Sequence, residues 1–421
     1  MRTDSTATQA LKAWLARPDA EAFPYEAVVA EFNRVGKHFV DRDLLLTLDA
    51  ARATLRAPAA VQEARSQLAR FLDCALDKFD GRYDNPSYLG IDLLPLPGTP
   101  ADEQDVGSPA EASRRHDRLF AMLVADLLRF ELEVADGATT LLPELRPDAR
   151  VTAKRCRLAV RALRPALARL GLRCDVIESD GLAGAHTVCR TVFADLTPAE
   201  RRTLRLTAMP VYVAHDEYMF IRVLQSYETT FAVITVHLRA ALAALADGRA
   251  PAAARALLAA ERTMHEAKPL FSLVATMLPE AFLTFREFTD GASAIQSRSY
   301  KAVESLCRRP EQRRVDSPAY QSVPEVRERV LAGQPTVDEA LHAARDAGRL
   351  TAGEHTEVCA AMQRFEAAVL AWRQTHYRLA VRMLGERRGT GYTEGVPYLH
   401  QARRVRLFTA SEAPAIVRDA A

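Results

Sequence analysis

Apolar residues recur at the spacing of an α-helix along most of this chain, and this periodicity constrains its fold more than any other feature. In the clearest example, Phe220 is followed by Leu224, Tyr227 and Phe231 at i+4, i+7 and i+11, which places all four on one helical face. Ala, Leu, Arg and Glu, which favour helices, fill most of the intervening positions. The sequence therefore predicts a predominantly all-α protein, with helices over residues 25–55 (with a break near residue 41), 61–80, 111–135, 147–170, 215–246, 252–278, 280–307, 336–346 and 353–385.

Three segments depart from the helical pattern. Between residues 93 and 110, four prolines and two glycines predict a loop, because proline lacks the amide donor that a helix needs. Near residues 172–194, two β-branched runs flank a glycine-bearing turn, a pattern that predicts a single β-hairpin. Between residues 308 and 324, four arginines and three prolines predict a solvated loop, with a basic binding patch as the alternative.

A helix start marks the expected boundary between two regions. Thr197 has the residue type of an N-cap, and Pro198 and Glu200 suit the first helical turn. We therefore expect an N-terminal helical region with one hairpin over residues 1–196 and a second helical region over residues 197–421.

Composition excludes several classes of protein. The 421 residues contain 56 Lys and Arg against 54 Asp and Glu, for a net charge of +2, so the basic excess of a nucleic-acid or membrane-surface protein is missing. No apolar run reaches the roughly 18–20 residues of a membrane span, and Met1–Ser5 does not resemble a signal peptide. The six cysteines include no C-x-x-C pair. We expect a cytoplasmic protein that binds neither nucleic acid nor membranes.

Common catalytic motifs do not occur, and three unusual segments remain. The chain has no Walker loop, no G-x-G-x-x-G, no G-x-S-x-G and no H-E-x-x-H. The first unusual segment, residues 215–228, combines two acids with the aromatic face that contains Phe220. The second, residues 282–297, sets Arg286 among phenylalanines, and the third, residues 372–392, carries His376 on a helix that leads into a glycine loop with Thr390.

These three segments resemble the motifs of the tryptophan 2,3-dioxygenases, a family within the histidine-ligated heme-dependent aromatic oxygenases. The family pattern runs D-E-H-L-F-I-x-x-H-Q-x-Y-E, then F-R-x-x-L-x-P-A-S-G-F-Q-S, then W-R-x-x-H-x-x-x-V-x-R-M-I/L-G followed by G-T-G-G. All three occur here in the same order, and the resemblance spans roughly residues 206–405. It implies a helical bundle around heme, preceded by an extra N-terminal region that the family pattern does not match.

The resemblance also implies roles for single residues. His376 stands at the position of the axial heme ligand, and the resemblance implies heme b as cofactor and O₂ as co-substrate. Arg286 stands at the position that binds the substrate carboxylate, and Thr390 and Gly391 stand in the loop that helps to hold the amino-acid group. Further positions implied in the pocket are those of Ser293, near the oxygen-binding side of the heme, and of Phe220, Phe282 and Tyr227 on the substrate side.

One departure from the family pattern changes the expected substrate. Leu224 replaces the distal histidine that accepts the indole N–H of tryptophan, and leucine has no acceptor. An indole N–H left unpaired in a dry pocket costs about 1–3 kcal/mol. Thr289, Gly291 and Glu394 also differ from the family pattern, which indicates a pocket of altered shape and charge.

The resemblance implies a heme-dependent oxygenase that inserts oxygen from O₂ into tryptophan or a tryptophan derivative, in specialised metabolism. The alternatives are a monooxygenase or oxidative-rearrangement catalyst that acts on a non-indole aromatic amino acid, a non-catalytic heme protein, and a helical scaffold without cofactor. The expected partner is a small aromatic amino acid, and the resemblance implies a homodimer or homotetramer.

Overall fold

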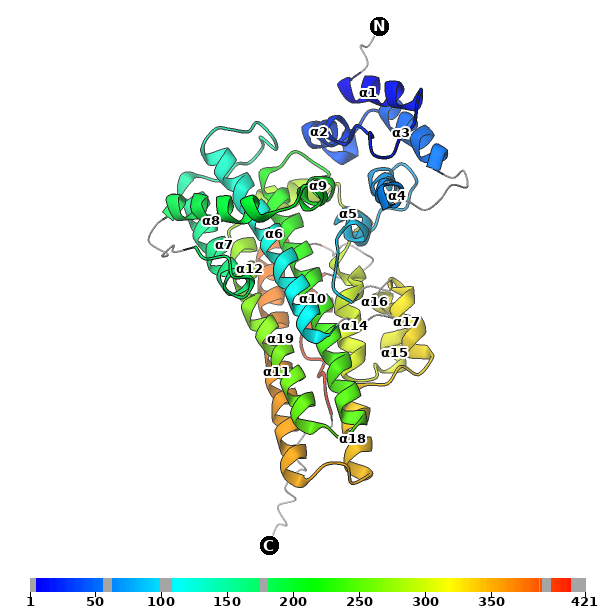
Figure 1. Ribbon diagram of the computed structural model, residues 1–421, viewed down its shortest axis with the longest axis vertical. Coiled ribbons are helices and arrows are strands. Elements are labelled where there is room, and N and C mark those ends of the chain that lie inside the picture. Colours follow the sequence, from blue (N-terminus) through cyan, green and yellow to red (C-terminus); the bar gives the residue numbers. More distant parts are fainter. Residues whose placement is uncertain are drawn as a thin grey trace. The chain divides into compact units, whose positions relative to one another are not determined.

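The computed structural model consists almost wholly of helices, as the periodicity predicts (Figure 1). It describes residues 5–55, 63–98, 108–174, 181–385, 387 and 395–409. Within these residues the β-structure is one isolated parallel bridge between Glu144 and Ala214. The all-α prediction is therefore confirmed.

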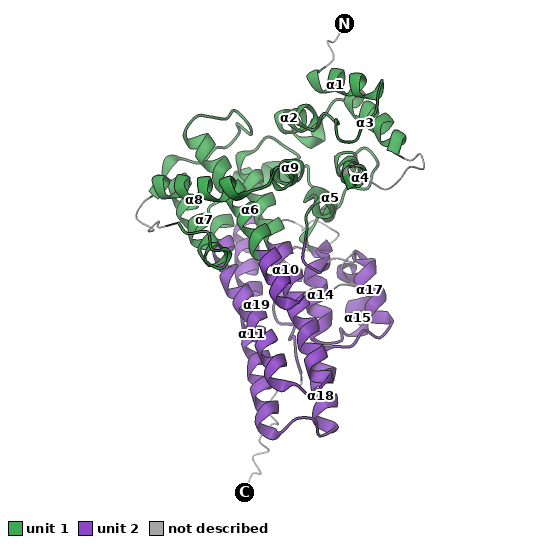
Figure 2. Ribbon diagram, viewed as in Figure 1, with its two compact units in different colours: residues 1–95, 117–226, 272–294 green, residues 96–116, 227–271, 295–421 purple. Residues whose placement is uncertain are grey.

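The chain folds into two compact units, each assembled from stretches that are separated in sequence (Figure 2). Unit 1 comprises residues 1–95, 117–226 and 272–294, and unit 2 comprises residues 96–116, 227–271 and 295–421. Both predicted regions, 1–196 and 197–421, contribute residues to both units. A helix does start at the predicted boundary near residue 197. The division of the chain into two domains at this point stays a prediction.

The N-terminal helices of unit 1 form a core of their own. They are α1 (Thr6–Leu15), α2 (Tyr25–Val35), α3 (Arg42–Leu55), α4 (Glu63–Ala75) and α5 (Asn85–Tyr88), with the short 3-10 helices η1 (Lys37–Phe39) and η2 (Ile91–Leu93). Four rings, Trp14, Phe23, Tyr25 and Phe71, meet edge to face with centroids 4.8–6.0 Å apart. Such pairs add about 0.5–1.5 kcal/mol each beyond the burial of their area, so this cluster holds α1, α2 and α4 together.

The predicted β-hairpin near residues 172–194 is wrong where the structure describes it, because its second strand is helical. Residues 187–193 lie within α8 (Gly181–Asp195), which packs against α7 (Ala149–Leu170). The buried residues of α8 include Ala185, Val188 and Val192, at the spacing of a helix. Packing of this face outweighs the β-propensity of valine and threonine. Residues 175–178, in the other predicted strand, lie outside the described residues.

The other helices of unit 1 carry or support the predicted site residues. They are α9 (Pro198–Leu206), α13 (Pro279–Arg286), and parts of α6 (Pro109–Ala135), α10 (His215–Ala246) and α12 (Lys268–Val274). The predicted start of α9 is confirmed, since the Thr197 hydroxyl accepts from the Glu200 amide and the Glu200 carboxylate accepts from the Thr197 amide.

Helix α10 is long and apolar enough to cross a membrane by length and composition, although the sequence contains no uninterrupted apolar run of that length. Of its most apolar 18-residue window, 72% is buried inside the protein. A core helix of a soluble protein has the same properties, and the burial of α10 is typical of such a helix.

Unit 2 is built around the long helices α11 (Ala250–Glu266) and α19 (Ala352–Leu384), which pack along each other (Figure 1). Its other helices are α14 (Arg298–Cys307), α15 (Gln312–Val315), α16 (Pro318–Gln321), α17 (Pro324–Leu331), α18 (Val337–Asp346) and α20 (Val396–Ala402), together with the remaining parts of α6, α10 and α12. The 3-10 helix η5 (Ala294–Gln296) spans the point in the sequence where the chain passes from unit 1 to unit 2. The predicted solvated loop at residues 308–324 is wrong, because α15 and α16 bury Val315, Ala319 and Tyr320 in a small apolar core.

Candidate functional site

In unit 1, the predicted substrate residues gather around α13. The rings of Phe220, Phe282 and Phe285 contact one another, with centroids 5.4–5.8 Å apart. Phe285 is fully buried, whereas Phe220 and Phe282 are half-buried, so parts of these two rings remain accessible. The structure therefore brings together the two phenylalanines that the sequence predicts as pocket walls.

Arg286 is the last residue of α13 and is half-buried. The turn that follows it is closed by Thr289, whose amide and hydroxyl both donate to the Arg286 carbonyl, at 3.1 and 2.9 Å. Ser293 follows this turn and is half-buried. The helix end fixes the backbone of Arg286 directly beside the phenylalanine cluster.

Leu224 lies one helical turn beyond Phe220 on α10 and is half-buried. The spacing of four residues places it on the same face as Phe220. The Leu224 side chain has no polar atom, so this face of α10 is apolar at both Phe220 and Leu224.

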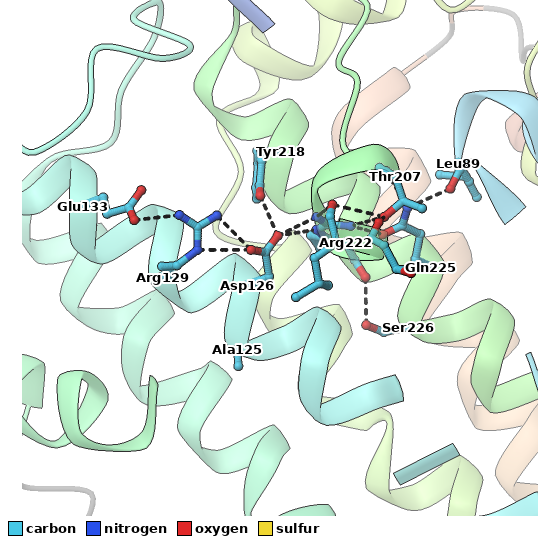
Figure 3. A network of polar contacts seen from close by, with 12 residues as sticks. Leu89, Ala125, Asp126, Arg129, Glu133, Thr207, Tyr218, Arg222, Gln225 and Ser226 are labelled. Atoms are coloured by element: carbon cyan, nitrogen blue, oxygen red, sulfur yellow. Dashed lines mark hydrogen bonds and ion pairs between the residues drawn. The ribbon is translucent and has the colours of Figure 1, made fainter. Parts of the chain in front are cut away.

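A buried polar network fixes this part of α10 (Figure 3). Asp126 on α6 accepts from the Arg222 guanidinium at 2.8 Å and from the Tyr218 hydroxyl at 2.5 Å. Arg222 also donates to Gln225 at 2.8 Å, and the Gln225 amide donates to the Leu89 carbonyl at 2.7 Å. Burial alone would raise the pKa of Asp126, but Arg222 and Arg129 lower it, so the carboxylate is ionised.

Two buried acids at the start of α10 connect it to other elements of unit 1. Asp216 accepts from the Leu278 amide at 3.0 Å and pairs with Arg155 at 2.7 Å. Glu217 accepts from two backbone amides and from the Tyr88 hydroxyl, at 2.7–3.1 Å, while its burial raises its pKa to about 8. The helix dipole favours acids at these positions, and the structure shows that each also has specific partners.

In unit 2, His376 lies on α19 among aromatic rings. Its imidazole is 5.9 Å from the Phe271 ring, nearly parallel to it, and 5.5 Å from the Trp372 ring. Burial lowers the pKa of His376 to about 4, so the ring is neutral at physiological pH. Among the described residues, neither of its nitrogens has a hydrogen-bond partner.

Tyr227 joins the same aromatic cluster of unit 2. Its ring lies 5.1 Å from Phe271 and 5.8 Å from Trp372, and its hydroxyl donates to the Ala267 carbonyl at 3.5 Å. Burial raises the pKa of Tyr227 well above its usual value, which keeps the phenol neutral. The structure thus places Tyr227 and His376 against the same two rings.

A buried charge cluster that no sequence motif predicts holds α19 near His376. Arg373 donates to the Tyr300 hydroxyl at 2.6 Å and to the Val405 carbonyl, and it lies 3.9 Å from Glu304. Glu304 also pairs with Arg314 at 2.5 Å. Burial alone would raise the pKa of Glu304, but Lys301, Arg314 and Arg373 lower it to about 2. Glu304 and Arg314 are only 10 residues apart, but Arg373 is 73 residues from Tyr300, so no local pattern predicts that Arg373 joins the cluster.

The structure does not place two of the predicted site residues, and it shows no cluster of metal ligands among the described residues. Thr390 and Gly391 lie outside the described residues. Within the described residues, no three His, Cys, Asp or Glu side chains converge as a metal site would require. A porphyrin iron needs only one such ligand from the protein, the role proposed for His376.

Unit 2 also contains a small, half-open pocket lined by three arginines, Arg239, Arg298 and Arg329, and by hydroxyl and apolar residues. No predicted site residue lines this pocket. Arg298 and Ser299 reach it from the first turn of α14.

Comparisons with known proteins place the similarity in the C-terminal half. Residues 205–355 match the family model for tryptophan 2,3-dioxygenase. The tryptophan 2,3-dioxygenase of Bradyrhizobium sp. (strain ORS 278) is 28% identical over 234 residues, which cover 47% of this chain and 83% of the relative. The enzyme of that name from Caulobacter vibrioides is 28% identical over 235 residues, covering 47% and 88%, and that from Burkholderia pseudomallei (strain 668) is 28% identical over 227 residues, covering 46% and 74%. The predicted resemblance is confirmed, and the family match leaves the N-terminal half unmatched.

Proposed function

We propose, from the similarity of the C-terminal half to the tryptophan 2,3-dioxygenases, that this protein is a heme-dependent oxygenase that inserts oxygen from O₂ into an aromatic amino acid. The observation that carries the proposal is the neutral, half-buried imidazole of His376 among the rings of α19 and Phe271. The family match ends at residue 355, so the assignment of His376 is supported by its own motif, Trp372-Arg373 before it and Arg382-Met383-Leu384-Gly385 after it.

The residues around His376 fit an iron porphyrin. An imidazole that ligates iron must be neutral and must offer a lone pair, and no described residue hydrogen-bonds to either nitrogen of His376. Phe271 and Trp372 supply flat apolar neighbours for a macrocycle. Heme b, when bound, would supply the redox chemistry with O₂.

Arg286 supports binding of a free amino acid. A guanidinium can hold a carboxylate through two parallel hydrogen bonds, a geometry that a lysine cannot provide. Phe220 and Phe282 lie beside the helix end that carries Arg286, so an aromatic side chain and a carboxylate could be bound together. We assign Thr390 and Gly391 to the same amino-acid group and Ser293 to the oxygen-binding side, on their motif positions. Binding at both ends of the substrate would fix the orientation of its ring.

Leu224 favours a substrate other than unmodified tryptophan. Its side chain cannot accept the indole N–H, whereas a ring without that donor loses nothing there. We therefore propose a tryptophan derivative, in specialised metabolism, as the substrate. A monooxygenase or rearrangement catalyst for a non-indole aromatic amino acid is the second candidate, and Leu224 is the observation that favours it.

The test is an absorption spectrum of the heme-loaded ferrous protein, titrated without O₂ against a panel of aromatic amino acids. The panel comprises L-tryptophan, 1-methyl-L-tryptophan, L-tyrosine and L-phenylalanine. We expect a saturable spectral change with at least one of them, because the substrate would bind beside the heme. A protein that takes up no heme, or a heme spectrum that no aromatic amino acid alters, would refute the proposal.

A further inference from the structure

The two ends of α13, the helix that ends in Arg286, are both held by residues of the N-terminal region that the family match leaves out. At the start of α13, the Leu278 amide donates to Asp216, and Asp216 pairs with Arg155 of α7 at 2.7 Å. Arg155 also donates to the Thr276 hydroxyl at 2.9 Å and to Glu131 at 2.9 Å. Arg155 is fully buried, so it fixes the turn before α13 from the interior of unit 1.

At the far end of α13, the contacts come from the segment between α4 and α5. The Lys78 ammonium donates to the Phe288 carbonyl at 2.7 Å and lies 3.7 Å from the centre of the Tyr83 ring. Gly291 has φ +98°, and a Cβ at this position would lie 3.0 Å from the Tyr83 carbonyl oxygen. The backbone of the Arg286 turn is thus in close contact with the N-terminal region at two points.

Aromatic packing adds a third contact at the same turn. The Phe288 ring lies 5.0 Å from each of three rings, those of His38, Phe39 and Tyr212, and it is stacked on Tyr212. His38 and Phe39 belong to η1, which is joined to the family-like region by backbone hydrogen bonds from Lys37 and His38 to the carbonyls of residues 210 and 211. The N-terminal region therefore contacts Phe288 through rings as well as through the Lys78 ammonium.

These contacts matter for Arg286 because recognition of a carboxylate through two hydrogen bonds depends on orientation. A binding group must be held within about 0.5 Å and 10–20° of its productive geometry, and its supporting residues provide that precision. Phe288 lies two residues beyond Arg286, so a shift of its carbonyl moves the end of α13 and the guanidinium with it.

We propose that the N-terminal region positions the Arg286 helix for amino-acid binding, with Lys78 and Arg155 as positioning residues that act through Arg286. This inference rests on the proposed function, because it assumes that Arg286 binds the substrate carboxylate. It assigns a role to residues that the family pattern does not match.

The experiment compares two ligands on the heme-loaded full-length protein. L-Tryptophan has the carboxylate that Arg286 would bind, whereas tryptamine has the same ring and ammonium group without it. Lys78→Met removes the donor and keeps an unbranched side chain that is one atom shorter. Lys78→Arg keeps a donor and a charge, and Lys154→Met is the control at an exposed lysine of α7. Hydrogen exchange over residues 282–294 reports separately on the turn itself.

We expect Lys78→Met to weaken L-tryptophan binding about tenfold, because displacement of a binding group by a fraction of an ångström has an effect of this size. Tryptamine binding should be unchanged. Exchange over residues 282–294 should be faster in this variant, Lys78→Arg should restore both properties, and Lys154→Met should resemble the wild type. In an Arg286→Ala background, Lys78→Met should weaken L-tryptophan binding no further.

Two outcomes would overturn the inference, and they differ from failure of the proposed function. Equal weakening of L-tryptophan and tryptamine would show that Lys78 supports the fold in general. Unchanged L-tryptophan binding with faster exchange would show that the turn does not control Arg286. A wild-type protein that binds heme but no aromatic amino acid of the panel would instead remove the proposed function, and the positioning role with it. If the wild type binds another panel member better than L-tryptophan, that amino acid and its decarboxylated amine replace L-tryptophan and tryptamine in the comparison.

Discussion

His376 is neutral because of its surroundings. A charged imidazole loses hydration when it is buried among rings, and this lowers its pKa to about 4. The lone pair needed for iron is therefore present throughout the physiological pH range. The same burial would make a charged replacement at this position unfavourable.

Replacement of His376 by alanine should abolish stable heme binding, because the described residues around it offer no second imidazole in ring contact with Phe271 or Trp372. The measurement is heme occupancy from the Soret absorbance after reconstitution, with added imidazole as a chemical rescue. His355→Ala, on the same helix, is the matched control and should bind heme normally. Full occupancy in His376→Ala would reject the ligand assignment.

Replacement of Arg286 by alanine should weaken binding of an aromatic amino acid by about 1.5–3 kcal/mol, the range for a hydrogen bond to a charged group. Arg286→Lys should recover only part of this loss, because an ammonium cannot form two parallel bonds to a carboxylate. Titration of the heme spectrum with L-tryptophan measures both variants. If alanine at this position leaves the apparent affinity unchanged, Arg286 does not bind the carboxylate.

Leu224 should determine the preference between indole rings. The wild type should bind 1-methyl-L-tryptophan at least as well as L-tryptophan, because it has no acceptor for the N–H. Leu224→His should shift the preference toward L-tryptophan by about 1–3 kcal/mol, the range for an unpaired buried donor. Leu224→Met controls for the change in shape. A wild type that strongly prefers L-tryptophan would contradict the role given to Leu224.

At the scale of elements, the sequence predicts most of the helices but not the turns that divide two of the longer ones. Helix α10 has the predicted bounds, and α2 and α3 are separated by the predicted break near residue 41. The predicted helix over residues 252–278 is divided at Ala267, just before Pro269, which suits the start of α12 but not the interior of a longer helix. The predicted helix over residues 280–307 is divided by the turn that contains Gly291.

The site could be predicted only in part, for a physical reason. Phe220 and Phe282 are predicted from their motif positions, and their rings contact each other, while their role as pocket walls stays a prediction. Asp126 and Arg222 are 96 residues apart, and Lys78 and Phe288 are 210 residues apart, so only the folded chain reveals these contacts. Short-range periodicity reports on faces of helices, and the partners of buried charges are set by tertiary structure.

The Glu304 cluster should make the stability of unit 2 depend on pH. The pKa of Glu304 is lowered to about 2 from its ordinary 4.5, so its ion pairs stabilise the fold fully above pH 4.5 and are lost as the pH falls toward 2. Arg314→Met removes one partner, and this should raise the pKa of Glu304 and move acid unfolding to higher pH. Circular dichroism during acid titration measures the midpoint.

Arg313→Met is the matched control for that prediction. Arg313 is adjacent in sequence, but its side chain is 87% exposed and pairs with Glu311. Its removal should leave the acid midpoint within error of the wild type, because an exposed pair contributes little. Equal shifts in the two variants would show that the Glu304 cluster does not set the acid stability.

At the scale of the whole molecule, most of the N-terminal region packs with residues 197–226 and 272–294 of the family-like region in unit 1. Asp126 and Phe130 on α6 contact Arg222 and Tyr218 on α10 within unit 1. A chain that began at residue 197 would leave Arg222 buried without its carboxylate. Loss of one partner of a buried pair costs about 3–5 kcal/mol, a large share of the stability of a domain.

Deletion of residues 1–196 should therefore abolish cooperative folding of the remaining chain. Thermal unfolding followed by circular dichroism, together with limited proteolysis, compares the truncated and full chains. We expect the truncated chain to be aggregated or rapidly cleaved throughout residues 197–294. A soluble truncated chain that unfolds cooperatively and binds heme would show that the family-like region folds alone.

The central claim, that oxygen from O₂ enters an aromatic amino acid at this site, is tested most directly by isotope labelling. The heme-loaded, reduced protein is given the amino acid that alters its spectrum, together with isotopically labelled O₂, and the product mass is measured. We predict a product with two labelled oxygen atoms, and a product with one would assign the protein to the monooxygenase alternative. An amino acid recovered without label, while the heme still binds O₂, would contradict the claim and leave a non-catalytic heme protein.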